Sequence, residues 1–230
     1  MPLVLSPMLI SVAMLEPTAM LQQHKSTLLS RVAALRKEPT VAARNAVLLA
    51  IQDLETNNVI DAPPDGRWSL IFSTQAETPD PNRPGANVLQ PLIDATYGAF
   101  FKVAPALAGA QQDGGSGASN EQMLSLSTGI VENRVRIPLP FVQSNLEICV
   151  DGAVEAGSTE PQQRQPQLLD VTFTECSFAI RRGAKDEDGN ALRIPLPRPV
   201  GTLRTTHCDD DLRVSRGGRG GVFVLKRLRS

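Results

Sequence analysis

The sequence predicts a mainly β fold, an antiparallel β-barrel preceded by an N-terminal α-helical arm. Two segments with helical spacing of apolar residues come first, and short segments of alternating apolar and polar residues follow from Gly66 onward. The connections between these short segments are polar and show no strand–helix alternation. These features indicate an antiparallel sandwich or barrel, and a barrel is favoured because closure removes exposed edges and about eight strands leave room for one small ligand.

The helical arm rests on two runs of apolar residues. The apolar positions at helical spacing are Leu21, Leu28, Val32 and Leu35, then Val47, Leu48, Ile51 and Leu54. Pro39 separates the runs, Thr40 suits the N-cap of the second, and the turn from Pro63 to Gly66 ends helical structure. We expect a helical arm over 19–60, a barrel domain over 61–230, and a targeting remnant or disordered segment over 1–18.

The strands are predicted from short runs of β-forming residues and from alternation. Residues 68–74 form the first strand, and residues 222–225 form the last, after a glycine turn. Residues 146–150 and 169–173 alternate between them, and the apolar positions change parity after Glu175, which predicts either a β-bulge or a strand that changes its inward face. Residues 110–121 are rich in Gly, Ser and Gln and predict a loop, whereas Asp188-Gly189 predicts a hairpin turn.

Bulk properties exclude several classes of function. The formal net charge is −1, so nothing attracts the whole chain to nucleic acid, and no apolar run reaches the ~20 residues of a membrane span. No phosphate-binding loop or Gly-x-Ser-x-Gly elbow occurs, and we expect no cofactor. Three distant cysteines predict free thiols in a reducing compartment, with Cys149 pointing away from the apolar face of its strand.

Trp68 is the sole tryptophan, and it opens the first strand. If the sheet closes, the first and last strands are neighbours, and an arginine can lie over the indole to seal the barrel floor. Spacing leaves both Arg213 and Arg216 open as that partner, with Arg213 favoured by its place between Leu212 and Val214.

An acidic cluster precedes the last strand. If residues 207–213 are extended, His207, Asp209, Asp211 and Arg213 share one face. Three roles stay open: a metal site, a polar latch in which Asp209 or Asp211 pairs with Arg213 or caps backbone amides, and a ligand anchor. The latch is favoured, and a metal is not expected because no further His or Cys at suitable spacing accompanies the cluster.

Two stretches are similar to the plastid lipid-associated proteins, or fibrillins. Residues 66–74 (GRWSLIFST) resemble the family's opening strand, and residues 201–225 (GTLRTTHCDDDLRVSRGGRGGVFVL) resemble its C-terminal signature. Two departures occur, since the family's Tyr and Leu in that signature are His207 and Cys208 here. The resemblance implies a lipocalin-like barrel in plastids, associated with thylakoids or plastoglobules, although no transit peptide is evident.

The predicted barrel together with this resemblance points to a non-catalytic carrier of an apolar lipid or isoprenoid, and the resemblance implies a prenylquinone, a carotenoid or a fatty acyl chain as the ligand. The residues expected to bind the ligand or close the barrel are Trp68, Leu70, Phe72, His207, Asp209, Asp211, Arg213 and Phe223. One alternative is a coat protein of plastid lipid particles that uses the helical arm at an interface. A less favoured alternative is a hydrolase with Cys149 or Cys176 as nucleophile and His207 as base.

Overall fold

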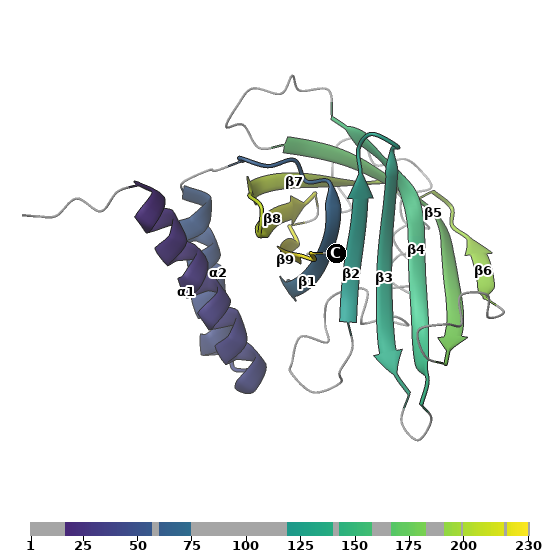
Figure 1. Ribbon diagram of the computed structural model, residues 1–230, viewed down its shortest axis with the longest axis horizontal. Helices are drawn as coiled ribbons and strands as arrows, with labels where there is room; N and C mark the ends of the chain where they lie inside the picture. The colour runs from purple at the N-terminus through teal and green to yellow at the C-terminus, as the bar shows by residue number, and fades with distance from the viewer. Residues whose placement is uncertain are drawn as a thin grey trace, which may run out of the picture.

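The computed structural model describes residues 17–56, 60–74, 119–139, 143–157, 167–182, 191–198, 200–218 and 220–229. Within them, two helices are followed by nine strands (Figure 1). The N-terminal residues 1–16, most of the loop predicted for residues 110–121, and the Asp188-Gly189 turn lie outside the described residues. No helix in the described ranges is long and apolar enough to cross a membrane.

The helices follow the predicted periodicity. Helix α1 spans Pro17–Lys37 and helix α2 spans Val41–Thr56. Thr40 caps α2, because its hydroxyl oxygen accepts a hydrogen bond from the backbone amide of Ala43 at 3.1 Å. Helix α1 carries Arg36 and Lys37 in its last turn, where positive charge complements the helix dipole.

The strands pair antiparallel throughout the described sheet. They are β1 Gly66–Ser73, β2 Ser119–Ser125, β3 Ile130–Pro138, β4 Asn145–Ala156, β5 Gln167–Arg181, β6 Leu192–Pro195, β7 Val200–Cys208, β8 Leu212–Gly217 and β9 Val222–Arg227.

The sheet closes on itself, as predicted. The strand order is β4-β3-β2-β1-β9-β8-β7-β5-β6, and a pairing between β4 and β5 joins the ends, so all strands except β6 form a ring. Strand β5 pairs through residues 175–178 with β6 and through residues 167–172 with β7. The first and last strands, β1 and β9, are neighbours in this ring, as expected for a barrel.

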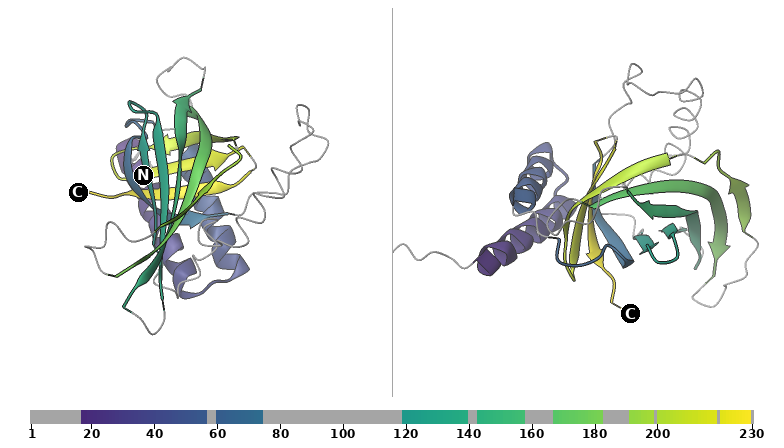
Figure 2. Two further views of the ribbon diagram at one scale, coloured as in Figure 1. Left: turned by 90° about the vertical axis from the view of Figure 1, so that its right-hand side faces the viewer. Right: turned by 90° about the horizontal axis from the view of Figure 1, so that it is seen from above.

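The helices cover the outer face of β1, β8 and β9 (Figure 2). Their apolar stripes and the outward residues of these strands form one core, made of Leu28, Val32, Leu35, Val47, Ala50, Ile51, Leu54, Phe72, Leu212, Val214, Val222 and Val224. Burial of this apolar area, at ~25 cal/mol per Å2, holds the arm on the barrel.

The inward face can be followed through the cross-strand register. Trp68 lies opposite Gln122, Gln122 opposite Asn133, Asn133 opposite Val150, and Val150 opposite Cys176. Residues directly opposite each other on paired strands share a face of the sheet. We call these five residues the lumen row, which crosses the inner wall from β1 to β5.

Bulges shift the alternation at defined points. Opposite Asp151 and Gly152, strand β5 presents Glu175 and Phe173, which leaves Thr174 as an extra residue and confirms the predicted bulge. A similar shift in β1 lies between Leu70 and Phe72.

Strands β2 and β3 are not predicted by alternation. Strand β2 begins at Ser119, so the loop predicted for residues 110–121 is wrong over its last three residues. The β2 sequence SNEQMLS is polar on both faces, because Gln122 faces the lumen while Glu121 faces outward, and such a strand has no apolar period.

Candidate functional site

One end of the barrel is crossed by residues 60–65, which we call the floor segment. Ile60 bridges Cys208 at the end of β7, and the backbone amide of Asp61 donates to the Cys208 carbonyl at 2.9 Å. Pro63 and Pro64 carry no amide hydrogen, so this backbone offers mainly carbonyl oxygens to the barrel. The floor segment therefore needs donors from the surrounding strands.

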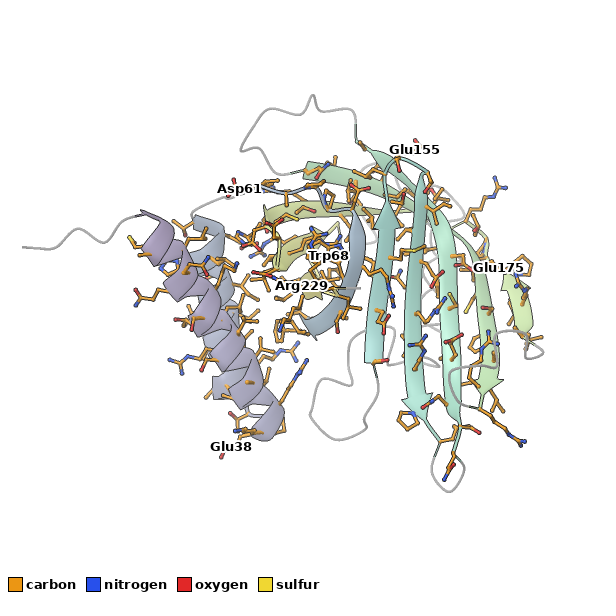
Figure 3. All side chains as sticks on the ribbon, viewed as in Figure 1. Glu38, Asp61, Trp68, Glu155, Glu175 and Arg229 are labelled. Carbon is orange, nitrogen blue, oxygen red and sulfur yellow. The ribbon has the colours of Figure 1, made fainter. Side chains whose placement is uncertain are left out.

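Trp68 and two arginines supply those donors. Trp68 is fully buried, and its indole Nε1 donates to the Pro64 carbonyl at 2.8 Å (Figure 3). Arg213 is 1% exposed, donates through Nη1 to the same carbonyl at 3.0 Å, and places its guanidinium carbon 4.9 Å from the indole centroid. The predicted contact between Trp68 and Arg213 is confirmed.

Arg227 is a second cation on the same ring, and the sequence reasoning missed it. Its guanidinium carbon lies 4.0 Å from the indole centroid, and its Nη1 donates to the Asp65 carbonyl at 2.7 Å. The sequence does contain a signal for this contact, because Arg227 lies at the end of the last strand and that strand is expected beside the first. The structure shows that Arg227 is the direct cross-strand partner of Trp68. Each sheltered cation–π contact contributes up to about 2 kcal/mol.

Gly66 allows this floor to close. Its φ of 114° lies in a region that L side chains rarely adopt, and an added Cβ would lie 2.8 Å from Arg227 Nη1. The backbone conformation at this position and the nearby guanidinium both favour glycine over any residue with a side chain. It lets the chain turn from the floor segment into β1 beneath the guanidinium.

Arg216, the other arginine considered for Trp68, serves the helices instead. Its Nε donates to Glu55 Oε1 of α2 at 2.8 Å, and the Thr206 hydroxyl donates to the same oxygen at 2.6 Å. The hydrogen bond to Glu55 raises the pKa of Arg216. Glu55 thus ties α2 to β7 and β8.

The acidic cluster is a turn and not an extended strand, which corrects the prediction for residues 207–213. Strand β7 ends at Cys208 and β8 begins at Leu212. Asp209 closes the turn, because its Oδ1 accepts from the backbone amides of Asp211 at 2.8 Å and Leu212 at 2.9 Å. These two aspartates are paired with other groups, and Arg213 points into the barrel.

The predicted face is also wrong, because the turn reverses the chain. His207 lies opposite Val214, on the side of the helices, whereas Cys208 lies opposite Arg213, on the inward side. His207, Asp209 and Asp211 therefore do not share a face with Arg213. Two components of the latch, the backbone caps and an ion pair, are present, but the ion-pair partner is in the helical arm.

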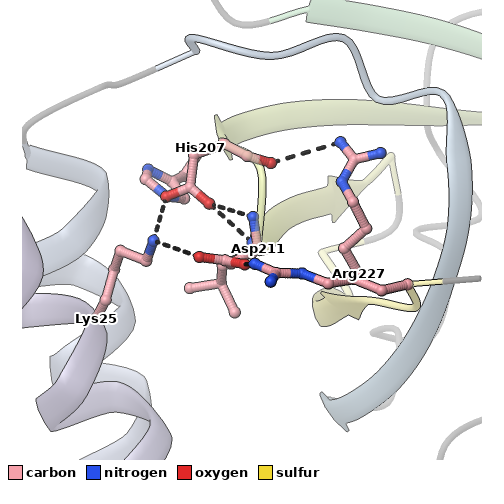
Figure 4. Close-up of polar contacts among 7 residues, drawn as sticks. Lys25, His207, Asp211 and Arg227 are labelled. Atoms are coloured by element: carbon pink, nitrogen blue, oxygen red, sulfur yellow. Dashed lines mark hydrogen bonds and ion pairs between the residues drawn. The ribbon is translucent and has the colours of Figure 1, made fainter.

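Lys25 of α1 is that partner (Figure 4). Its Nζ lies 2.7 Å from Asp209 Oδ2 and 3.8 Å from Asp211 Oδ2, and His207 Nε2 lies 3.2 Å from Asp209 Oδ2. Burial by itself raises the pKa of Asp209, but the bonds from His207, Lys25 and the two backbone amides hold that pKa well below its usual range. Asp209 is therefore ionised at neutral pH.

The cysteines are free and protonated. Cys149 is half-buried, whereas Cys176 and Cys208 are buried. Burial raises the pKa of Cys149 to about 12 and those of Cys176 and Cys208 to about 11. The Cys149 thiol donates to Asp151 Oδ1 and the Cys208 thiol to the Pro63 carbonyl. Because the thiolate is the nucleophile, this chemistry does not favour a cysteine hydrolase.

Cys149 also belongs to a small cluster on the outer face, with Glu132 and Asp151 within 4.8 Å of one another. Arg134 forms a salt bridge with Glu132 at 2.7 Å and so balances the charge of that carboxylate. The guanidinium and the protonated thiol make the cluster a poor cation site.

The predicted barrel-lining residues divide between the two faces. Leu70 and Phe223 pack with Trp68 on the inner side, whereas Phe72 lies in the core beneath the helices. The register shift in β1 between Leu70 and Phe72 separates two residues that ordinary alternation would place together.

Apolar residues cover most of the inner wall, including two members of the lumen row. Leu124, Val131, Val154, Leu169 and Val171 form one cluster, and Val135, Ile148, Val150 and Cys176 form another. Phe173, Phe178, Ile137, Leu146 and Leu203 pack against these clusters but remain only partly buried. The inner wall away from the floor is thus apolar and retains accessible surface.

These features define a closed antiparallel β-barrel with one sealed end and a two-helix layer on its outer side. The PAP_fibrillin family model matches residues 22–226, so the chain belongs to this family, the plastid lipid-associated proteins. Neither a search of curated proteins nor a search of solved structures returned a match. Family membership implies a lipid-associated role in plastids, and the family is generally structural and not catalytic.

Proposed function

We propose that this protein is a non-catalytic carrier that holds an apolar lipid or isoprenoid inside the barrel. The ligand classes considered are prenylquinones, carotenoids and fatty acyl lipids, at thylakoid membranes or plastoglobules. The observation that supports this proposal is the partly accessible apolar wall around Phe173 and Phe178, opposite a floor sealed by Trp68 and two arginines. Burial of a ligand against such a wall contributes ~25 cal/mol per Å2 removed from water.

Mass spectrometry of lipids that copurify with the folded protein tests the proposal. The folded protein should retain an apolar lipid through gel filtration. Phe178→Arg, on the inner wall, should release it, because a charge in an apolar site is costly. Ile130→Arg is the matched control, since Ile130 is 45% exposed and precedes the inward Val131 in β3. Equal lipid retention in the two variants would contradict an internal site.

A coat role on lipid particles is a second candidate. The buried stripe of the helical arm cannot contact a lipid surface, because Leu28 and Leu54 are fully buried against the barrel, whereas Val41 and Leu49 of α2 are 76% and 62% exposed. More apolar surface is exposed on the inner face at the edge formed by β5 and β6, where Ile180 is 61%, Leu192 64% and Ile194 43% exposed. The register places all three on the same face as Phe178. Figure 1 shows β6 on the side of the sheet away from the helices.

Flotation with galactolipid vesicles separates the two candidates. A triple serine variant of Ile180, Leu192 and Ile194 should lose vesicle binding if the edge contacts particles. Because these side chains share the inner face with Phe178, copurified lipid is measured in the same variant, and loss of the lipid with vesicle binding intact assigns them to the internal site. Binding to vesicles that survives these three substitutions would remove the coat role from this edge.

A further inference from the structure

Two side-chain amides stand in the apolar inner wall and are linked to a buried charge. Arg213 Nη2 donates to Gln122 Oε1, and Gln122 Nε2 donates to Asn133 Oδ1 at 2.9 Å. The three residues come from β8, β2 and β3, and they form a relay that ends in the middle of the lumen row. Neither the family match nor the proposed carrier role explains why these interior positions are polar.

The hydrogen-bond chemistry fixes the direction of the relay. A guanidinium can only donate, so the oxygen of Gln122 must face Arg213 and its NH2 group must face β3. Asn133 must then accept with its oxygen. Its own Nδ2 group is consequently the free end of the relay, and this end is a hydrogen-bond donor.

The surroundings of Asn133 make this donor available to a ligand. Its neighbours on the inner face of β3, Val131 and Val135, are fully buried, and its cross-strand partner Val150 is 4% exposed. Asn133 and Gln122 are themselves only half-buried. A bound chain that covers this amide leaves it without a partner unless the ligand itself supplies an acceptor, so a ligand with an acceptor binds more tightly than one without.

The positive charge of Arg213 at one end of the relay matches the positive end of the N–H dipole that Asn133 presents at the other end. No carboxylate among the described residues lies within ion-pair distance of Arg213, and its Nε has no hydrogen-bond partner. Arg227 adds a second positive charge at Trp68. Asp65, the acid that acts on Arg213 electrostatically, has its Oδ1 engaged by the backbone amide of Leu126 at 2.7 Å.

We propose that Asn133 Nδ2 recognises an acceptor oxygen on the ligand, either the carbonyl of a ketone or quinone or a carboxylate. The inference rests on the proposed carrier function and narrows it to apolar chains that carry an acceptor head group. A donor-only head group, such as an ammonium, is rejected by both the donor and the charge behind it. A pure hydrocarbon leaves the amide unpaired.

The test compares four probes with matched sixteen-carbon chains: palmitate, 2-hexadecanone, hexadecane and hexadecylammonium. Affinity is measured by displacement of the neutral dye Nile red from the full chain. The ketone and the carboxylate should bind about tenfold tighter than the hydrocarbon, as one hydrogen bond predicts, and the ammonium should bind weakest. A preference for palmitate over the ketone identifies the carboxylate as the head group, and the reverse identifies a carbonyl.

Substitutions at Asn133 give an outcome that a structural role would not. Asn133→Leu should equalise the ketone and the hydrocarbon, and Asn133→Asp should reverse the ranking of palmitate and the ammonium. Asn145→Asp is the matched control, because Asn145 is half-buried at the start of β4 and alternates with the inward Leu146. Its ranking should remain that of the native chain.

The failures are distinguishable. Equal binding of ketone and hydrocarbon to the native chain, or an unchanged ranking in Asn133→Asp, overturns the acceptor site and leaves the carrier function standing. A folded native chain that binds none of the four probes overturns the carrier function itself.

Discussion

Replacing Asp209 by asparagine tests the structural latch in the turn between β7 and β8. The Asp209 side chain is 15% exposed and accepts from Lys25, His207 and two backbone amides. Asparagine keeps the size and one acceptor oxygen but removes the charge that pairs with Lys25, whose side chain is only 9% exposed. Losing one partner of a buried pair costs about 3–5 kcal/mol, and the oxygen that remains reduces this to about 2–3 kcal/mol.

Asp211→Asn is the matched control in the same turn. Its carboxylate is 51% exposed, its Lys25 contact is 3.8 Å, and its other partner, Arg229, is 82% exposed. Exposed ion pairs contribute little, so we expect a change in the free energy of unfolding below about 0.5 kcal/mol. Urea unfolding at pH 7, followed by the fluorescence of the single Trp68, measures both variants.

The pH dependence of stability is a second test of the ion pair between Asp209 and Lys25. The folded-state pKa of Asp209 is lowered, so its stabilisation is present above its unfolded pKa of about 4 and is lost as the pH falls toward the folded value. Asp209→Asn should flatten the loss of stability below about pH 4. The latch would be refuted if Asp209→Asn and Asp211→Asn lowered the free energy of unfolding equally. It would also be refuted if the effects of Lys25→Met and Asp209→Asn on that free energy were additive.

Three further changes test other parts of the molecule. Trp68→Ala should cost about 3–5 kcal/mol in urea unfolding followed by circular dichroism, and a cost below about 1 kcal/mol would remove Trp68 from the floor. Glu55→Gln should lower stability by about 1–2 kcal/mol through its bond to Arg216, whereas no change would mean that α2 docks by apolar contact alone. Thiol titration should find three reactive cysteines in urea and slow reaction in the native chain, because burial raises their pKa; fast native reaction would contradict the protonated state.

Local patterns predicted the elements whose two faces differ in polarity. Both helices, β4 and β5 each have one apolar face, so their period is visible in the sequence. Strands β1 and β9 are apolar on both faces, and they are recognised as short runs of β-forming residues. The contact between Trp68 and Arg213 followed from ring closure, which makes the first and last strands neighbours.

The missed elements have the opposite character. Strands β2 and β3 carry Gln122 and Asn133 on the inner face, which destroys the apolar period at the positions proposed to meet the ligand. The partner of Asp209 could not be found from local spacing, because Lys25 belongs to an element 184 residues earlier in the chain (209 − 25). The bulge in β1 similarly moved Phe72 outward against its ordinary parity.

The adjacency of β1 and β9 has a consequence for synthesis and folding. Strand β1 and both helices find much of their buried surface on β8 and β9, near residue 225. During translation, the apolar faces of the helices and β1 therefore remain exposed until nearly the whole sequence has left the ribosome. Such contacts between distant residues are entropically costly to form, so folding should be slow, and chaperones that cover the helices before β9 emerges should raise the yield.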